Sequence, residues 1–499
     1  MNLKNALVKS LTLHRDKIAL EIDDRAFSYY ELDRDSSTLA NSLLESDGER
    51  VLIFCSRSYL TYVSILACIK ANLTFVPLNP KFNKERLKLM IQNSKANKII
   101  VDETCKEMFL ELQSELNLEL EVFYSFVESK ANNLHKAVQN EIAYILFTSG
   151  STGIPKGVKV SRDNLYAYIL KMQKLLQITP HDKISNFFDI TFDVAMHDIF
   201  CTFLSGARLC VIPTNTLINP IKFIQQKELT IFYAVPSLIK FLSKLKALKE
   251  GILPTLRLSL FCAEALSADN AKIWAKCANK SEVYNLYGPT EATIIVMEYL
   301  CYKFGEPCNK ELSEVGIPLG YPLENLEISL RDDNGKEVEN EEMGEIWISG
   351  DQVALGYLDD EKKTNEKFIH INHKIYYKSG DIGIKKQIGD ELLYCYCGRI
   401  DDQVKIQGYR IELLEVDLKL SKITNLPSIA IVAEENGINK LIGVIEADNI
   451  DTTEILKQCK DALPSFMIPT RFEKMHKFPL NANGKIDRNK IKEEILCKK

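Results

Sequence analysis

No part of the 499-residue sequence contains an apolar run approaching the ~20 residues that a membrane-spanning helix needs. The first residues, MNLKNALVKSLTLHRDKIALE, also lack the apolar core of a secretory signal. Neither sign of charge dominates, because 63 basic residues stand against 68 acidic ones. Composition therefore gives no reason to expect a nucleic acid or an anionic membrane as partner. We expect a cytoplasmic protein without membrane insertion.

The 13 cysteines lack the paired C-x2-C spacing that closes a zinc site. Cys395 and Cys397 come nearest, but they alternate along an expected strand. The simpler interpretation is two small apolar residues on one strand face. Thiols without ligands or partners suit a reducing compartment.

The first half of the chain alternates β-branched runs with amphipathic stretches. Its length exceeds what one hydrophobic core usually serves, so at least two domains are expected. The alternation is the rhythm of βαβ units and predicts parallel sheets covered by helices. Strands are expected at 51–55, 73–79, 98–102 and 143–148, and helices at 59–71, 84–97 and 164–176.

Between Glu314 and Gly398 the strand candidates become shorter and are separated by turn residues. They are NLEISLRD, GEIWISG, KIYYKSGD and ELLYCYCGR, and they predict an antiparallel, barrel-like segment. The last hundred or so residues suffice for a small α+β domain. We therefore expect an α/β fold, with doubly wound sheets and a barrel-like subdomain in residues 1–400 and a small α+β domain in residues 401–499.

A loop rich in glycine and hydroxyl groups follows the expected strand at 143–148. Glycine lets the backbone approach a polyphosphate, and hydroxyl and N–H groups donate to its oxygens. The loop does not follow the P-loop pattern, because Lys156 precedes Gly157. Taken alone, it could be an ordinary flexible linker. The candidate phosphate-binding residues are Thr148, Ser149, Gly150, Ser151, Thr152, Gly153 and Lys156.

The segment TSGSTGIPKG (148–157) is similar to the signature loop of the adenylate-forming superfamily, which includes acyl-CoA synthetases, luciferases and the adenylation domains of peptide synthetases. By its motifs the chain is identified as a member over nearly its whole length. The further matching segments are FDVAMHDIF (192–200), NLYGPTEATI (285–294), YYKSGD (376–381), GRIDDQVKIQGYRIE (398–412) and NGKIDR (483–488).

The resemblance implies an ATP site with a magnesium ion. Tyr287 would stack on adenine, and Asp381 with Arg399 would hold the ribose hydroxyls. Thr290 would contact the α-phosphate as a catalytic residue, and Glu291 would be the ligand of Mg²⁺, a role that suits a carboxylate. The other nucleotide-binding positions implied are Ala263, Glu264, Ala265, Asn285, Leu286, Gly288, Pro289, Tyr396 and Gly398.

The resemblance also implies a mobile carboxy-terminal domain. Lys485 would be the catalytic lysine and would contact the nucleotide, offsetting the negative charge of the transition state. Without the surrounding motif, Lys485 would be interpreted as a solvated lysine in an Asn-Gly turn. Asp401 would be the hinge of residues 401–499, and Gly408 would leave room for a pantetheine arm.

The resemblance places Asp193 where amino-acid-activating members carry an aspartate that pairs with the α-ammonium group. A fatty or aryl acid needs no such anion, because a buried unpaired carboxylate is costly. Asp193 is alternatively the N-cap of a helix, and His197 is alternatively a hydrogen-bonded core histidine. A small or medium uncharged side chain should fit best among the implied substrate residues. These are Asp193, Val194, His197, Tyr233, Leu260, Cys262, Leu286, Ile294 and Ile295.

These motifs predict a ligase that activates a small uncharged amino acid with ATP and passes it to the phosphopantetheine thiol of a carrier protein. FCAEAL (261–266) resembles the D-alanine:carrier protein ligases, whereas Tyr233, Leu260 and Leu286 resemble prolyl:carrier protein ligases. No carrier or condensation domain follows Lys499, so a separate carrier is expected. The alternatives are an acyl-CoA or aryl-CoA synthetase and a nucleotide-binding pseudoenzyme.

Overall fold

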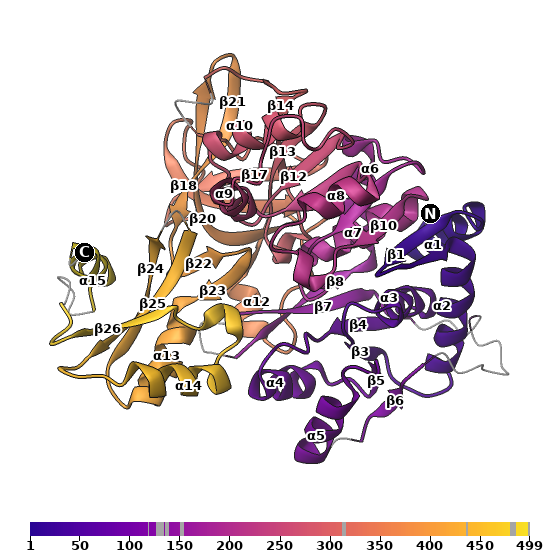
Figure 1. Cartoon of the computed structure of the whole chain (residues 1–499), viewed down its shortest axis with the longest axis horizontal. Coiled ribbons are helices and arrows are strands. Elements are labelled where there is room, and N and C mark those ends of the chain that lie inside the picture. Colours follow the sequence, from indigo (N-terminus) through magenta and orange to yellow (C-terminus); the bar gives the residue numbers. More distant parts are fainter. Residues whose placement is uncertain are drawn as a thin grey trace. The chain divides into compact units, whose positions relative to one another are not determined.

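The chain forms two compact units (Figure 1). The computed structural model describes residues 1–117, 119–125, 134, 139–149, 154–311, 316–435, 438–479 and 486–497. The first unit consists of Met1–Pro80, Ile91–Phe147 and Gly157–Ile400. The second consists of Lys81–Met90, Thr148–Lys156 and Asp401–Lys499, so it takes two early segments besides the expected carboxy-terminal domain.

The largest sheet of the first unit has ten strands in the order β15-β14-β13-β12-β11-β9-β10-β1-β2, with β16 paired to β14. Strands β13, β12, β11, β9, β10 and β1 are parallel to their neighbours in this run, and β2, β14, β15 and β16 pair antiparallel. The strands are β1 (Ile18–Ile22), β2 (Arg25–Ser28), β9 (Lys183–Asn186), β10 (Arg208–Val211), β11 (Ile231–Ala234), β12 (Leu258–Phe261), β13 (Glu282–Tyr287), β14 (Met297–Lys303), β15 (Glu306–Pro307) and β16 (Tyr321–Pro322).

A second sheet has six strands in the order β6-β5-β3-β4-β7-β8. The pairs β5 with β6, β3 with β5, β3 with β4, and β4 with β7 are all parallel, as the βαβ rhythm predicts. The strands are β3 (Arg50–Phe54), β4 (Thr74–Pro77), β5 (Lys98–Val101), β6 (Glu121–Phe123), β7 (Ile142–Thr148) and β8 (Lys156–Ser161).

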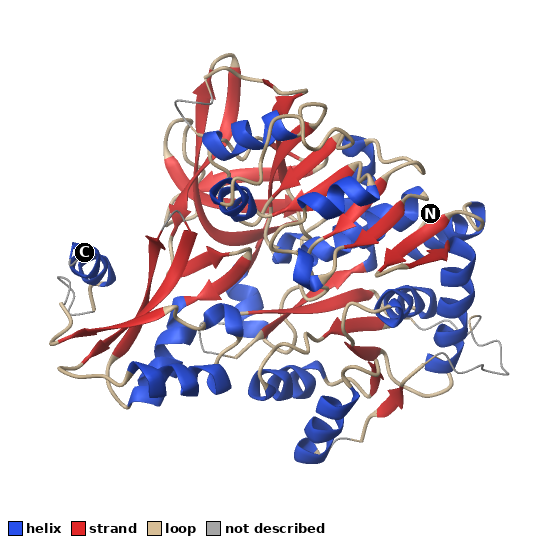
Figure 2. Cartoon of the chain, in the orientation of Figure 1, coloured by secondary structure: helices blue, strands red, loops and turns tan. Residues whose placement is uncertain are grey.

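Helices line these sheets (Figure 2). Helix α3 packs on β3 and β4 and α7 packs on β9 and β10, while α1 contacts both helices and so links the two layers. The expected helix at 84–97 ends at Ser94, because Lys95 turns to a left-handed φ of 50°. The helices are α1 (Leu3–Leu13), α2 (Tyr29–Leu43), α3 (Tyr59–Ala71), α4 (Lys84–Ser94), α5 (Lys106–Leu116), α6 (Arg162–Leu176), α7 (Asp193–Ser205), η1 (Thr214–Thr216), α8 (Ile221–Lys227), α9 (Pro236–Lys244), α10 (Ala268–Cys277), η2 (Thr290–Ala292) and α12 (Glu361–Lys367).

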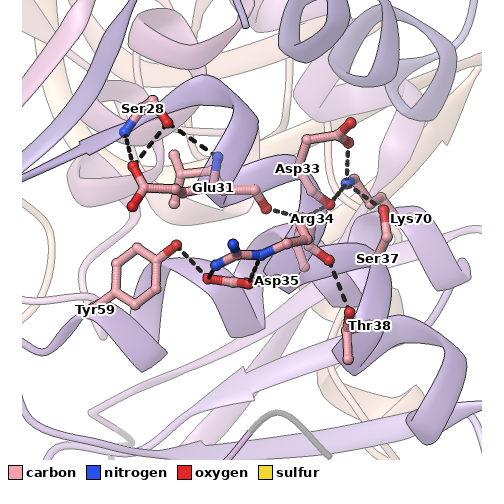
Figure 3. A network of polar contacts seen from close by, with 11 residues as sticks. Ser28, Glu31, Asp33, Arg34, Asp35, Ser37, Thr38, Tyr59 and Lys70 are labelled. Atoms are coloured by element: carbon pink, nitrogen blue, oxygen red, sulfur yellow. Dashed lines mark hydrogen bonds and ion pairs between the residues drawn. The ribbon is translucent and has the colours of Figure 1, made fainter. Parts of the chain in front are cut away.

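Helix α2 shows how local sequence sets these elements (Figure 3). Ser28 and Glu31 form a capping box, in which each side chain satisfies an amide at the start of the helix. From α3, the ammonium group of Lys70 reaches back to Asp33 Oδ1 at 2.5 Å and to Ser37 Oγ at 2.9 Å. These contacts fix α2 against α3.

The third sheet of the first unit has five strands and is antiparallel throughout, as expected for this region. Its order is β17-β18-β20-β19, with β21 also paired to the long strand β20. The strands are β17 (Leu326–Arg331), β18 (Met343–Gly350), β19 (Phe368–Ile371), β20 (Lys374–Ile388) and β21 (Glu391–Arg399).

The second unit is a small α+β body with the hairpin β22-β23 and the sheet β24-β25-β26. Its early segments are built into it: Arg86, in the first turn of α4, forms a buried ion pair of 3.0 Å with Glu415, and Phe82 packs edge to face on Phe466. Its carboxy-terminal elements are β22 (Gln403–Ile406), β23 (Tyr409–Glu412), α13 (Leu413–Thr424), β24 (Ser428–Glu435), β25 (Ile438–Glu446), α14 (Thr452–Ala462), η3 (Ser465–Met467), β26 (Arg471–Met475) and α15 (Arg488–Cys497).

Within the described ranges, no helix combines the length and the apolar character needed to cross a bilayer. Cys395 and Cys397 lie on β21, as expected.

Candidate active site

A carboxylate held by two partners lies where three strands of the first unit approach one another. Tyr287 ends β13, Asp381 lies within β20, and Arg399 ends β21 opposite Asp381. The Tyr287 hydroxyl donates to Asp381 Oδ2 at 2.5 Å, and Arg399 Nη1 donates to Asp381 Oδ1 at 2.5 Å. Burial, and then the Asp381 charge, raise the pKa of Tyr287, so the phenol keeps its proton. The structure thus brings together three residues that were predicted to hold adenosine.

The backbone around Asp381 is fixed by its neighbours. The Asp381 amide donates to Ser379 Oγ, which in turn donates to the Ile346 carbonyl at 2.7 Å. The amide of Gly380, which has a left-handed φ of 75°, donates to Glu345 Oε1 at 2.9 Å. Glycine at this turn avoids the strain that a side chain would add. The carboxylate is therefore oriented before any ligand arrives.

The loop after β13 is compact and strained. A Cβ atom on Gly288 would lie 2.1 Å from the Ile294 carbonyl oxygen, so a side chain there would displace the loop. Thr293 and Ile294 have φ values of 55° and 76°, which are unfavourable for β-branched residues. Such strain persists where surrounding contacts enforce it, and it concentrates at functional sites.

Two residues that the sequence did not reveal hold this loop. The Gln352 side-chain amide donates to the carbonyls of Ile295 at 2.8 Å and Thr293 at 3.2 Å. The Tyr357 hydroxyl donates to Glu291 Oε1 at 3.0 Å, and the Glu291 side chain is buried. Neither Gln352 nor Tyr357 lies in a local pattern that would have predicted these contacts, because their partners are about sixty residues away in sequence.

Most of the predicted substrate residues lie at the carboxyl ends of parallel strands and in the first turns of α7, and Ile294 and Ile295 lie in the loop between η2 and β14. Tyr233 and Leu260 are paired across β11 and β12, and Cys262 directly follows β12. In open α/β sheets this edge is where ligands usually bind. Apart from half-buried Asp193, all of the predicted substrate residues are buried: Val194, His197, Tyr233, Leu260, Cys262, Leu286, Ile294 and Ile295.

Helix α7 places two of these residues one turn apart. Asp193 is its first residue, and Phe192 occupies the N-cap position. The alternative prediction that Asp193 is the N-cap is therefore wrong by one residue. His197 follows one turn later, and Tyr168 Oη lies 2.7 Å from its Nδ1. Burial lowers the pKa of His197 to about 3, so the ring is neutral at ordinary pH. The His197 ring packs edge to face on Tyr233, with 5.0 Å between centroids.

The remaining predicted nucleotide-binding positions of the first unit lie after β12, in or after β13, and on β21. Ala263 has a φ of 70°, and the neighbouring Glu264 accepts a hydrogen bond from the Ser237 amide at 2.9 Å. Asn285 donates to the Pro318 carbonyl at 2.8 Å. The others fall into two groups: Ala265, Leu286, Pro289 and Thr290 lie beside the ends of β12 and β13, and Tyr396 and Gly398 lie on β21.

Other predicted positions belong to the second unit. The Ser149 hydroxyl donates to the Arg410 carbonyl at 2.9 Å. Asp401 begins the carboxy-terminal segment, and Gly408, with a φ of 83°, lies in the turn between β22 and β23. Thr148 and Lys156 flank the loop predicted to bind phosphate, as the last residue of β7 and the first of β8. Five predicted residues lie outside the described residues: Gly150, Ser151, Thr152, Gly153 and Lys485.

Known proteins resemble the chain over most of its length. The family described as AMP-binding enzyme matches residues 7–358. Zwittermicin A synthase ZmaJ of Bacillus cereus is 32% identical over 95% of this chain and 91% of its own. A D-alanine--D-alanyl carrier protein ligase of Bacillus licheniformis is 29% identical over 99% of this chain and 100% of its own.

A solved structure agrees with these relatives. The Vibrio cholerae adenylation domain AlmE, determined in complex with glycyl-adenosine-5'-phosphate, superposes with a TM-score of 0.87 at 26% identity. The match covers 99% of this chain and 98% of that one. The family match spans more than half of the sequence, and ZmaJ is similar over nearly all of it. The chain belongs to the family of AMP-binding enzymes.

Proposed function

We propose that this ATP-using ligase activates a small uncharged amino acid as its aminoacyl-adenylate and transfers it to the phosphopantetheine thiol of a separate carrier protein. The observation that carries the proposal is the buried Asp381 carboxylate, held at 2.5 Å by both Tyr287 and Arg399. A carboxylate fixed in this way can accept hydrogen bonds from a ribose, with an aromatic ring beside it for a purine.

Glu291 provides a carboxylate suited to a magnesium ion. Glu291 is buried, and Tyr357 fixes one of its oxygens at 3.0 Å. Mg²⁺ is usually held by one or two protein carboxylates together with phosphates and water. Glu291 therefore fits the ion, which when bound would neutralise charge on the phosphates. Thr290 precedes it in η2, where a hydroxyl would donate to the α-phosphate.

The start of α7 supports an amino acid as the acid component. Asp193 supplies a negative charge at the start of α7, and the predicted substrate residues Val194, Tyr233 and Leu260 are buried and mostly apolar. An α-ammonium group would be attracted to that charge, whereas a fatty or aryl acid brings no positive charge to it. An uncharged side chain then suits the buried residues around it.

Two displacements complete the proposed reaction. A carboxylate oxygen of the amino acid attacks the α-phosphorus of ATP, and pyrophosphate leaves. The carrier thiolate then attacks the carbonyl carbon, forming the thioester while AMP leaves. Lys485 would stabilise the charge of the first step, and turning of residues 401–499 about Asp401 would open the way for the thiol past Gly408.

The experiment that tests this function is pyrophosphate exchange with a panel of D- and L-amino acids, fatty acids and aryl acids, followed by transfer to a phosphopantetheinylated carrier protein or to coenzyme A. We expect exchange with an amino acid and transfer to the carrier. Exchange with only fatty or aryl acids, and transfer to coenzyme A, would instead identify an acyl-CoA or aryl-CoA synthetase.

Asp193→Ala provides the internal test. Without its carboxylate, the variant should lose at least about tenfold in kcat/KM for the amino acid, because the ammonium group would be buried without a partner. The KM for ATP should change little. The matched control is Asp163→Ala, which removes an exposed aspartate from the first turn of α6. Equal amino-acid turnover in Asp193→Ala and the parent would refute the assignment.

A further inference from the structure

One ring nitrogen of His197 lies within hydrogen-bonding distance of two side chains, and the other has no hydrogen-bond partner among the described residues. The residue is 1% exposed. Its Nδ1 lies 2.7 Å from Tyr168 Oη and 3.7 Å from Cys201 Sγ. In the described part of the chain, no group forms a hydrogen bond with its Nε2. The position of the ring proton therefore determines whether Nε2 offers a donor or an acceptor.

The hydrogen bond to Tyr168 determines which nitrogen carries the proton. Tyr168 is fully buried, and its hydroxyl has no other hydrogen-bond partner among the residues described. If the hydroxyl donates to Nδ1, then the proton of the neutral ring lies on Nε2 and one donor is left without an acceptor. In the reverse arrangement both the Tyr168 O–H and the Nε2 lone pair are left without partners. The first arrangement is therefore favoured, and it makes Nε2–H a donor.

A second polar group without a partner packs against this ring. The His197 and Tyr233 rings meet edge to face, with 5.0 Å between their centroids. The Tyr233 hydroxyl is buried and has no hydrogen-bond partner among the described residues. After burial, the nearby Cys262 thiol also raises the pKa of Tyr233, in part as a hydrogen-bond partner, although sulfur is a weak acceptor. Two neighbouring side chains thus each carry a donor that has no nitrogen or oxygen acceptor among the described residues.

Their place on α7 relates them to the amino acid. Asp193 and His197 are four residues apart in one helix, so they share a face and are separated by about 6 Å along its axis. If Asp193 holds the α-ammonium group, then His197 lies about one helical turn away, at a distance that an amino-acid side chain spans.

We propose that the side chain of the substrate carries a hydrogen-bond acceptor, a hydroxyl or a carboxamide, which accepts from His197 Nε2–H. The proposal rests on the proposed function, because it takes the position of the ammonium group from Asp193. Tyr168 is a positioning residue, which keeps the proton on Nε2. An acidic side chain is disfavoured, because a neutral imidazole does not balance a buried negative charge.

Pairs of amino acids with nearly the same shape test this preference. The pairs are threonine with valine, serine with 2-aminobutyrate, and asparagine with leucine, compared by kcat/KM in pyrophosphate exchange. At least one polar member should exceed its apolar partner by about tenfold or more, because the apolar partner leaves Nε2–H without an acceptor. Preference for the apolar member in every pair that reacts would overturn the proposal and leave the amino-acid ligase function intact. Exchange with fatty or aryl acids alone would overturn the function itself.

Substitutions then test the roles of the two side chains. Tyr168→Phe frees the proton to move to Nδ1, so the polar-to-apolar ratio should fall about tenfold. A merely structural role would lower both rates together and leave the ratio unchanged, which would overturn the positioning role. Tyr284→Phe is the matched control, because it also removes a tyrosine hydroxyl, one that bonds to Glu282 on the same strand.

Should Tyr168→Phe fold poorly, His197→Leu and His197→Gln replace it. The polar-to-apolar ratio should be lost with leucine and partly retained with glutamine, which keeps an N–H donor. Equal ratios in these two variants would contradict the proposal.

Discussion

Asp381 is nearly fully buried, and it is bound on one oxygen by Tyr287 and on the other by Arg399. Arg399 places a positive charge next to the buried carboxylate. The Tyr287 hydroxyl donates a hydrogen bond to it, which holds the Tyr287 ring beside the carboxylate. The two hydrogen bonds therefore fix the orientation of the Asp381 carboxylate.

Asp381→Asn should therefore raise the KM for ATP by about tenfold or more, because an amide places a donor where ribose and Tyr287 both need an acceptor. Exchange assays at varied ATP concentration measure this change. Asp390→Asn is the matched control, since Asp390 is exposed in the turn that joins β20 to β21. A KM for ATP equal to that of the parent would remove Asp381 from the nucleotide site.

His197 should give the protein a recognisable acid sensitivity. Burial lowers its pKa from 6.5 to about 3, so between these pH values the unfolded chain binds a proton that the native chain does not. Stability should be complete above pH 6.5 or so and should fall as the pH drops toward 3, by up to roughly 5 kcal/mol from this residue. Urea unfolding from pH 7 to pH 4 should show a shallower loss for His197→Gln than for the parent. The exposed His181, changed to Gln, should leave the parent slope unchanged.

Tyr287, Asp381 and Arg399 could be predicted as site residues because each lies in a short sequence motif. The sequence did not reveal that the Tyr287 hydroxyl bonds to Asp381, since that contact joins residues 94 positions apart. Gln352 and Tyr357 were missed for the same physical reason: their roles depend on which distant backbone groups the fold brings to them, and their own neighbours in sequence carry no sign of it.

At the scale of elements, the βαβ rhythm predicted the parallel strands β3, β4, β5 and β7, and the shorter turn-separated segments predicted the antiparallel strands β17, β18, β20 and β21. Hydrophobic periodicity predicts these strands because the burial of one or both strand faces requires a particular pattern of apolar residues along the sequence. Ends of elements were less accessible. Helix α4 ends at Ser94 because the next residue, Lys95, is left-handed, and no glycine or proline there indicates the end of the helix.

Helix α2 offers a test of local stabilisation. Ser28→Ala removes the side-chain half of the capping box with Glu31 and should lower the free energy of unfolding by about 1 kcal/mol. The urea midpoint followed by circular dichroism measures this loss, and adenylation at low temperature should remain unchanged. Ser28→Asp should restore most of the stability, because aspartate also caps helices well. Equal losses for both variants would mean that the hydroxyl stabilises something other than the cap.

At the scale of the whole molecule, the sequence placed a boundary at Asp401, and contacts also divide the chain after Ile400. That residues 401–499 turn as a mobile domain stays a prediction, as does the role of Lys485. What the sequence did not indicate is that Lys81–Met90 and Thr148–Lys156 belong with this later segment. Those contacts join positions more than two hundred residues apart, and periodicity carries no information on them.

Lys485→Ala should separate the two half-reactions. Loss of the cation should slow adenylate formation by about 100- to 1,000-fold, while transfer from supplied aminoacyl-adenylate to the carrier stays close to the parent rate. Single-turnover assays of each step measure the two effects. Lys490→Ala, on the exposed surface of α15, is the control. Comparable slowing of both steps would indicate a structural lysine.

The ion pair between Arg86 and Glu415 has a practical consequence for dissecting this enzyme. A polypeptide ending at Ile400 would keep a guanidinium that is 7% exposed in the intact chain but would lose the carboxylate that balances it. A fragment beginning at Asp401 would carry the opposite defect, together with the bared face of Phe466. In the intact chain the two side chains are buried together, so separating the fragments removes their ion pair and exposes both charges to water. Fragments that are to fold and recombine should therefore be cut elsewhere than at the covalent junction, or be supplied with the missing early segment in trans.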